Sequence, residues 1–132
     1  MKIVWKFDDE HEWDPFSLLG SIKLIDHLGN NIEDKIIFID SWFLSINEGL
    51  ESLATGNTLN IDLMDEPDPF VFAIENDSGT ISYKNQKLYI NDISDSVRVL
   101  KNEVKKLIDC LFTFPEPRDI ETIRELRKIL QN

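Results

Sequence analysis

Cysteine is almost absent from this chain of 132 residues, which has a single thiol at Cys110. One cysteine cannot form an internal disulfide, and within an amphipathic stretch it indicates packing rather than nucleophilic chemistry. Apolar runs are also short, because none approaches the roughly 18 residues that cross a bilayer. The amino terminus, MKIVWKFDDEHE, lacks the apolar core and the small-residue cleavage site of a secretory signal. We therefore expect a soluble, cytoplasmic protein that does not associate with a membrane.

Few residues are arranged for cofactor or metal chemistry. The five glycines form neither GxGxxG nor GxxxxGK, so nothing indicates a nucleotide-binding loop. The two histidines, His11 and His27, belong to no HExxH or Cys/His ligand array, and we interpret both as surface residues. The sequence therefore predicts no cofactor, no catalytic residue and no enzymatic activity.

Positive charge is missing from the middle of the chain. Residues 36–83 contain nine Asp or Glu and no Lys or Arg. Residues 1–92 carry 18 acids and 6 bases, a net charge of −12, whereas residues 93–132 carry 7 acids and 8 bases. This balance argues against nucleic acid as a partner, because its binding depends on Lys and Arg that displace counterions from phosphates. A basic protein would instead be attracted, with an association rate raised about 10- to 1,000-fold at low salt.

Hydrophobic periodicity predicts one α+β domain over residues 1–132. Alternation with period two predicts strands, and a period of 3.6 predicts helices. Strands are expected at 2–7, 18–26, 58–64, 69–75, 80–83 and 87–91, and helices at about 40–55, 94–112 and from 119. Residues 27–35, HLGNNIEDK, are interpreted as a turn. The order ββαββββαα suggests an antiparallel sheet of about five to six strands packed on one face by helices.

The first predicted helix has two different faces. We expect its N-cap at Asp40 or Ser41. Its apolar face is assigned to the core, with Trp42, Phe43, Ile46, Leu50 and Leu53. Leu44 points about 140° away, on the surface that carries Asp40, Glu48 and Glu51. Two interpretations stay open: a single exposed leucine, or an apolar anchor ringed by carboxylates that docks on a basic protein.

Two loops are rich in carboxylates. The first, DDEHEWD at residues 8–14, is interpreted as a solvated strand connection, with a partner surface or a hard-cation site as alternatives. The second, DEPDP at residues 65–69, has the composition of a hairpin loop. Its two prolines also restrict the backbone, so that Asp65, Glu66 and Asp68 would be held apart at the end of a hairpin.

Residues 36–92 resemble a known group of proteins. The helix DSWFLSINEGLESLATG, followed by a strand and DEPDPFVF, is similar to small acidic bacterial proteins that accompany polymorphic toxins. That group includes the immunity proteins of contact-dependent growth inhibition. The resemblance implies a non-enzymatic inhibitor that binds a cognate toxin, often a basic nuclease, and covers its active site.

Three functional hypotheses follow. In the first, the protein is a monomer or weak dimer that binds a basic partner, such as a nuclease toxin. The partner-binding surface of this hypothesis consists of Asp40, Leu44, Glu48, Glu51, Asp62, Asp65, Glu66 and Asp68. In the second, the same carboxylates bind a divalent metal or support metal-assisted hydrolysis, since a cation would relieve their repulsion. In the third, a structural protein self-associates through a sheet edge.

Overall fold

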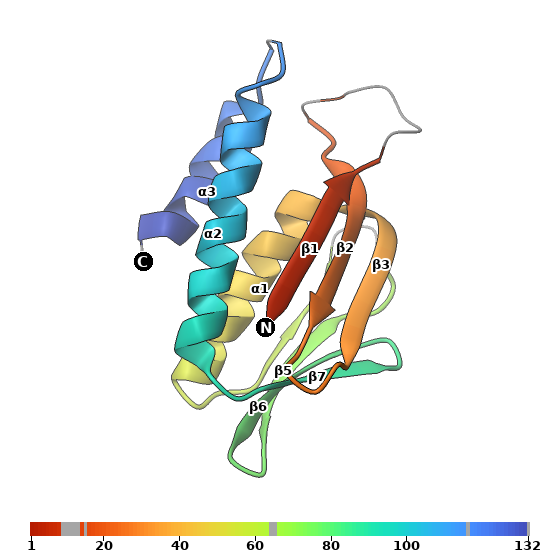
Figure 1. Cartoon of the computed structure of the whole chain (residues 1–132), viewed down its shortest axis with the longest axis vertical. Coiled ribbons are helices and arrows are strands. Elements are labelled where there is room, and N and C mark those ends of the chain that lie inside the picture. Colours follow the sequence, from red (N-terminus) through yellow and green to blue (C-terminus); the bar gives the residue numbers. More distant parts are fainter. Residues whose placement is uncertain (9–13, 15, 64–65, 116, 132) are drawn as a thin grey trace.

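Figure 1 shows a computed structural model, which describes residues 1–8, 14, 16–63, 66–115 and 117–131. The described part forms the strands β1 (Lys2–Phe7), β2 (Leu19–Ile25), β3 (Asn31–Phe38), β4 (Leu59–Ile61), β5 (Phe70–Glu75), β6 (Ser78–Tyr83) and β7 (Gln86–Ile90). It also forms the helices α1 (Ile39–Ala54), α2 (Ile93–Leu111) and α3 (Ile120–Gln131). The predicted α+β class is confirmed.

The strands form two antiparallel sheets. β1, β2 and β3 make one sheet in that order, and β4 to β7 make a four-stranded meander. The predicted antiparallel pairing is confirmed, but the expected single sheet of five to six strands is divided into sheets of three and four. The β5–β6 hairpin closes through Asn76 and Asp77, whose φ angles of 50° and 65° suit a tight two-residue turn.

β3 is the strand that sequence patterning missed. Residues 27–35 were expected to form a turn, but only residues 27–29 do so, and the strand begins at Asn31. A bulge explains the error, because Gly20 pairs with Ile37 while Ile22 pairs with Asp34, which leaves two β3 residues opposite Ser21. The extra residue breaks the alternation of buried and exposed side chains on which strand prediction depends.

Side chains join the two sheets where β3 lies beside β7. The Gln86 side chain accepts from the Glu33 amide at 2.9 Å and donates to the Glu33 carbonyl at 3.5 Å. At one end of this seam, the Asp26 carboxylate accepts from the Tyr89 amide at 3.0 Å. These side-chain hydrogen bonds satisfy backbone groups of the edge strands β3 and β7. They replace the continuous backbone hydrogen bonding that would join β3 and β7 into one sheet.

Helix α1 lies against the inner faces of both sheets. It begins at Ile39, directly after β3, and its N-cap residue Phe38 makes no side-chain capping bond, so the predicted cap at Asp40 or Ser41 was wrong. The predicted apolar face is confirmed as buried, with Trp42, Phe43, Ile46, Leu50 and Leu53. Gly49 allows the closest approach to the meander, because an added Cβ would lie 2.3 Å from the Phe72 ring.

Helices α2 and α3 cover the side of α1 that faces away from the meander. Figure 1 shows α3 folded back along α2, and α3 also contacts α1. Each helix begins at a capping aspartate, because the Asp95 amide donates to Asp92 at 3.0 Å and the Thr122 amide donates to Asp119 at 3.2 Å. None of the described helices combines the length and the apolar character that a membrane span requires.

Trp42 organises the aromatic part of the core. Its ring lies edge-on to Phe70 at 4.6 Å and to Tyr83 at 5.0 Å between ring centroids. All three side chains are almost completely buried. This packing holds the start of β5 and the end of β6 against the first turn of α1, and it thereby positions the loop that carries Glu66 and Asp68.

Candidate functional site

The outer face of α1 presents part of the predicted acidic surface. Glu48 and Glu51 are exposed, and the Glu51 carboxylate accepts from the Asn47 side chain at 3.4 Å. Leu44 is half-buried and packs against the hydrophobic core, so it exposes less apolar area than the fully exposed leucine that the sequence suggested. The outer face of α1 therefore presents mainly carboxylates, and little apolar area, to a partner.

Asp40 lies apart from this exposed face, at the start of α1. Its side chain is half-buried and close to Asp119, the capping residue of α3. Burial raises the pKa of Asp40, and the charge of Asp119 raises it further, while the amides of Asp40 and Ser41 act in the opposite direction. Packing of α3 near the start of α1 thus separates Asp40 from Glu48 and Glu51, with which the sequence analysis had grouped it.

The acidic loop between β4 and β5 is partly occupied by bonds within the fold. Asp62 is exposed, whereas Glu66 and Asp68 are half-buried, and Asp65 lies outside the described residues. The Tyr83 hydroxyl, at the end of β6, lies 3.2 Å from the Glu66 carboxylate. The Glu66 carboxylate thus lies against the fold, and Asp62 is the exposed carboxylate among the described residues of this loop.

Tyr83 and Asp34 form the most polar contact near that loop. The Tyr83 hydroxyl donates to Asp34 at 2.6 Å, and Lys84 makes an ion pair with the same carboxylate at 3.2 Å. Burial alone would raise the pKa of Asp34, but the bonds from Tyr83, the Lys35 amide and Lys84 outweigh it and lower the pKa.

The same contact disfavours ionisation of Tyr83. Burial raises the pKa of Tyr83 well above its usual value, and the hydrogen bond and charge of Asp34 raise it further. At neutral pH the hydroxyl stays protonated and the Asp34 carboxylate stays ionised, so neither group is adjusted for proton transfer. The arrangement acts as a structural link between β3, β6 and the acidic loop.

Charge pairing differs between the two halves of the chain. On α2 and α3 four of the five acids pair with bases three residues later, in Asp95–Arg98, Glu103–Lys106, Glu121–Arg124 and Glu125–Lys128. On α1 and after β4, the described residues include no ion pair to Asp40, Glu48 or Asp62. Of these three, Glu48 and Asp62 are exposed and thus available to solvent or a partner.

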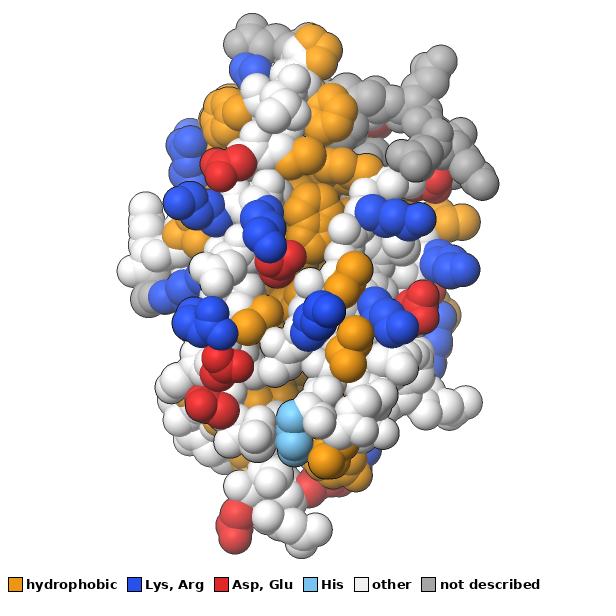
Figure 2. All heavy atoms as spheres, viewed as in Figure 1, with side chains coloured by type: hydrophobic (Ala, Val, Ile, Leu, Met, Phe, Trp, Pro, Cys, Tyr) orange, Lys and Arg blue, Asp and Glu red, His pale blue; other side chains and the backbone are white. Residues whose placement is uncertain are grey.

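Basic side chains gather on a face that the sequence did not reveal. Figure 2 shows Lys and Arg, with apolar side chains between them, over the face formed by α2 and the β1–β3 sheet. Lys2 and Lys6 lie four positions apart on β1, and Lys23 lies on the neighbouring strand β2. The spacing of Lys2 and Lys6 along a strand was the available signal, because residues four apart in a strand share one face.

Metal ligands were one alternative for the acidic loops. Within the described part of the chain, no group of three or more His, Cys, Asp or Glu side chains converges as metal ligands would. Residues 9–13 of the first acidic loop lie outside this part. Of its two described carboxylates, Asp14 accepts from the Phe16 amide at 2.9 Å and Asp8 is half-buried.

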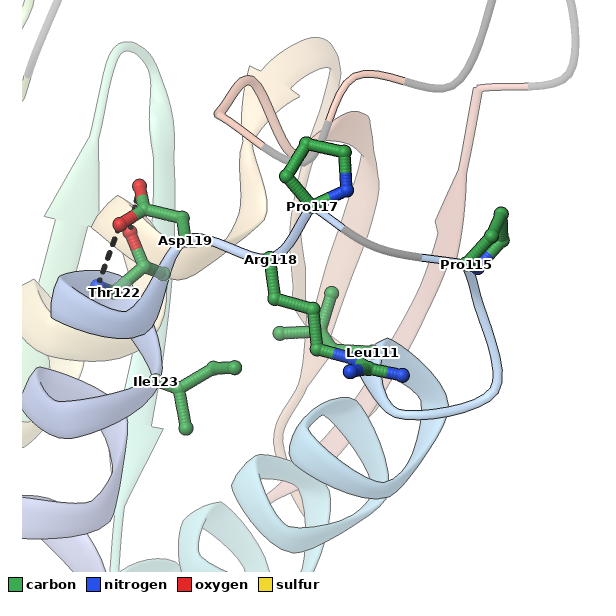
Figure 3. Close-up of a pocket in the computed structure, with 7 residues that line it drawn as sticks. All are labelled: Leu111, Pro115, Pro117, Arg118, Asp119, Thr122 and Ile123. Atoms are coloured by element: carbon green, nitrogen blue, oxygen red, sulfur yellow. Dashed lines mark hydrogen bonds between the residues drawn. The ribbon is translucent and has the colours of Figure 1, made fainter.

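A small pocket lies where the chain passes from α2 to α3 (Figure 3). It measures about 10 Å³ and is lined by Leu111, Pro115, Pro117, Arg118, Asp119, Thr122 and Ile123. Figure 3 shows Asp119 bonded to Thr122, and Arg118 directed back toward α2. A volume of this size holds about one water molecule, so the pocket belongs to the helix joint and does not admit a substrate.

Comparison of this chain with protein-family models, with curated proteins and with solved structures finds no match. No activity or residue role is therefore carried over from a relative.

Proposed function

We propose that the protein is a non-enzymatic binding protein whose acidic surface engages a basic protein partner. We define the acidic surface by the exposed residues Glu48, Glu51 and Asp62, with Asp68 at its margin. The observation that supports this proposal is the contrast in charge pairing, because four of the five acids of α2 and α3 form ion pairs with nearby bases. The described part of the chain supplies no such base to Glu48 or Asp62.

Electrostatics explains why a basic partner fits. Carboxylates that lack a neighbouring cation repel one another, and a partner that brings Lys or Arg relieves this repulsion while it accelerates the encounter. Glu66 and Asp40 have a different role in the proposal. Glu66 holds the loop through Tyr83, and Asp40 lies at the contact with α3, so they position the surface more than they touch the partner.

The resemblance to immunity proteins suggests which basic partner to test. We propose a cognate bacterial toxin in the cytoplasm, whose cationic substrate-binding surface would be covered by the acidic surface. A nuclease fits this role, because its Lys and Arg already attract phosphates and would attract exposed carboxylates by the same force.

The test measures association with the protein encoded by the reading frame next to this gene. Glu48→Lys and Asp62→Lys are each expected to slow association roughly tenfold at about 50 mM salt, and to weaken its salt dependence. Asp109→Lys is the matched control, since it makes the same charge change at an exposed position of α2. If the wild-type protein does not bind, this toxin is not the partner. If the three variants associate at equal rates, the acidic surface is not the binding site.

A further inference from the structure

The outer face of the β1–β3 sheet carries lysines in a regular arrangement. Strand register places outward-facing residues in two complete rows across the sheet, Lys2–Ile25–Asn31 and Val4–Lys23–Glu33. A third row pairs Lys6 with Ser21 and ends beside the β3 bulge, which contains Lys35. These positions together contain one carboxylate, that of Glu33, and four lysines. Among the described residues, no ion pair involves any of these four lysines. This sheet face is therefore positively charged in a protein whose net charge is −11.

The bulge in β3 places a strained apolar side chain beside the third row. Ile36 has a φ angle of 55°, in the left-handed region, which is energetically costly for a β-branched residue. Its side chain is also 64% exposed, so burial within the fold does not offset that cost. Strain of this kind is found where a surface needs a particular side chain for binding or catalysis.

A hollow of about 320 Å³ lies at the same place. Lys6, Ser21, Lys35 and Ile36 line it, together with Phe7, Gly20 and Asp8. Lys6 on β1 and Lys35 on β3 line the hollow from either side of β2, and adjacent strands are about 4.8 Å apart. Two ammonium groups can therefore reach one carboxylate from opposite sides, with a hydroxyl between them and an apolar wall at Ile36.

We propose that this sheet face is a second docking surface, which binds an acidic and partly apolar segment of another protein. One carboxylate of the segment lies in the hollow between Lys6 and Lys35, and an adjacent apolar side chain contacts Ile36. Val4, which is 47% exposed in the next row, extends the apolar contact along β1. An extended segment of about six residues matches the length of β1.

Charge complementarity favours a protein segment over nucleic acid. The apolar side chains between the lysines, including Val4 and Ile36, suit a peptide better than a sugar–phosphate chain. The net charge of −11 also repels a polyanion at long range, whereas a short acidic segment is attracted by the local lysines. The two surfaces of the protein would then engage partners of opposite charge.

The test uses a labelled peptide of about ten residues that alternates Glu with Leu and Gly, and fluorescence anisotropy as the measurement. Wild-type protein is expected to bind it at least roughly tenfold tighter than the same peptide with Gln for Glu. Lys35→Glu is expected to abolish this preference. Lys105→Glu, an exposed lysine of α2 with the same charge change, is expected to retain it.

Ile36→Gly separates binding from folding. It is expected to weaken peptide binding roughly tenfold while the melting temperature stays equal or rises, because glycine relieves the left-handed strain. A lower melting temperature would show that Ile36 serves the fold, and it would overturn the proposal. Equal affinity for the Glu and Gln peptides, equal effects of Lys35→Glu and Lys105→Glu, or tighter binding of an oligonucleotide of about ten residues would overturn it as well.

Discussion

Asp26 follows β2 and is 7% exposed, yet each of its carboxylate oxygens has hydrogen-bond donors. One oxygen accepts from the amides of Leu28 and Asn30 at 2.9 Å, and the other accepts from the Asn30 side chain and the Tyr89 amide. Burial alone would raise the pKa of Asp26, but these bonds outweigh it and lower the pKa. The residue therefore stabilises both the β2–β3 turn and the contact with β7 as an ion.

Asp26→Asn is expected to lower the free energy of unfolding by roughly 2–3 kcal/mol at pH 7, since an amide nitrogen would face backbone donors. A lowered folded-state pKa means that the contribution of Asp26 is present above the usual value of 3.8 and is lost as pH falls through the folded pKa. Denaturant titrations of both proteins between neutral and acid pH measure this loss.

Asp14→Asn is the control for that experiment, because Asp14 is exposed and accepts a single amide at 2.9 Å in its own turn. We expect its effect to stay within about 0.5 kcal/mol at all pH values. Equal effects of Asp26→Asn and Asp14→Asn would show that burial and the long-range bond to Tyr89 contribute nothing.

Among the elements, β3 and β7 show how a side chain replaces a strand partner. Gln86 presents a carbonyl and an amide group to the backbone of Glu33, as a paired residue would. The seam consists of separate bonds and not a ladder, so each bond is expected to matter for the local opening of these strands.

Gln86→Ala is expected to lower stability by roughly 1–2 kcal/mol and to increase hydrogen exchange at the Glu33 amide selectively. Amides of the β2–β3 ladder, such as that of Ile32, serve as internal controls because their strand pairing is unchanged. Uniform loss of protection across β2 and β3 would contradict the seam as a local joint.

For the whole molecule, charge is uneven: four acids of α2 and α3 form ion pairs, whereas Glu48 and Asp62 have none among the described residues. Repulsion among the carboxylates of a chain with net charge −11 acts against the folded state. Exposed ion pairs contribute about 0–1 kcal/mol each, so added salt lowers stability only slightly when it screens them. Added salt also screens the repulsion among the carboxylates, and this effect favours the folded state.

The melting temperature is therefore expected to rise by a few degrees between about 20 mM and about 500 mM sodium chloride. The double variant Glu48→Gln and Asp62→Asn should show a smaller rise, because it removes two unpaired carboxylates. A double variant of paired acids, Glu121→Gln and Glu125→Gln, is the control. A melting temperature that falls with salt would show that the ion pairs outweigh the repulsion.

Local sequence determined the type of most elements and the amount of charge on each. The 3.6-residue period of Trp42, Phe43, Ile46, Leu50 and Leu53 is sufficient for a helix with one buried face, and the structure confirms it. Asn76 and Asp77 likewise suit the tight turn of the β5–β6 hairpin, because Asn and Asp adopt positive φ angles more readily than most residues. These features depend on residues that are near one another in the chain, so a single sequence contains the physical cause.

Tertiary structure decided the features that depend on distant residues. Asp26 meets Tyr89 across 63 positions, and that bond belongs to the seam that divides the strands into two sheets. The bulge at Ile36, the covering of Asp40 near Asp119 and the gathering of lysines from β1, β2 and β3 follow from strand register and helix packing. Register and packing are collective properties of the folded chain, so the periodicity of one segment does not reveal them.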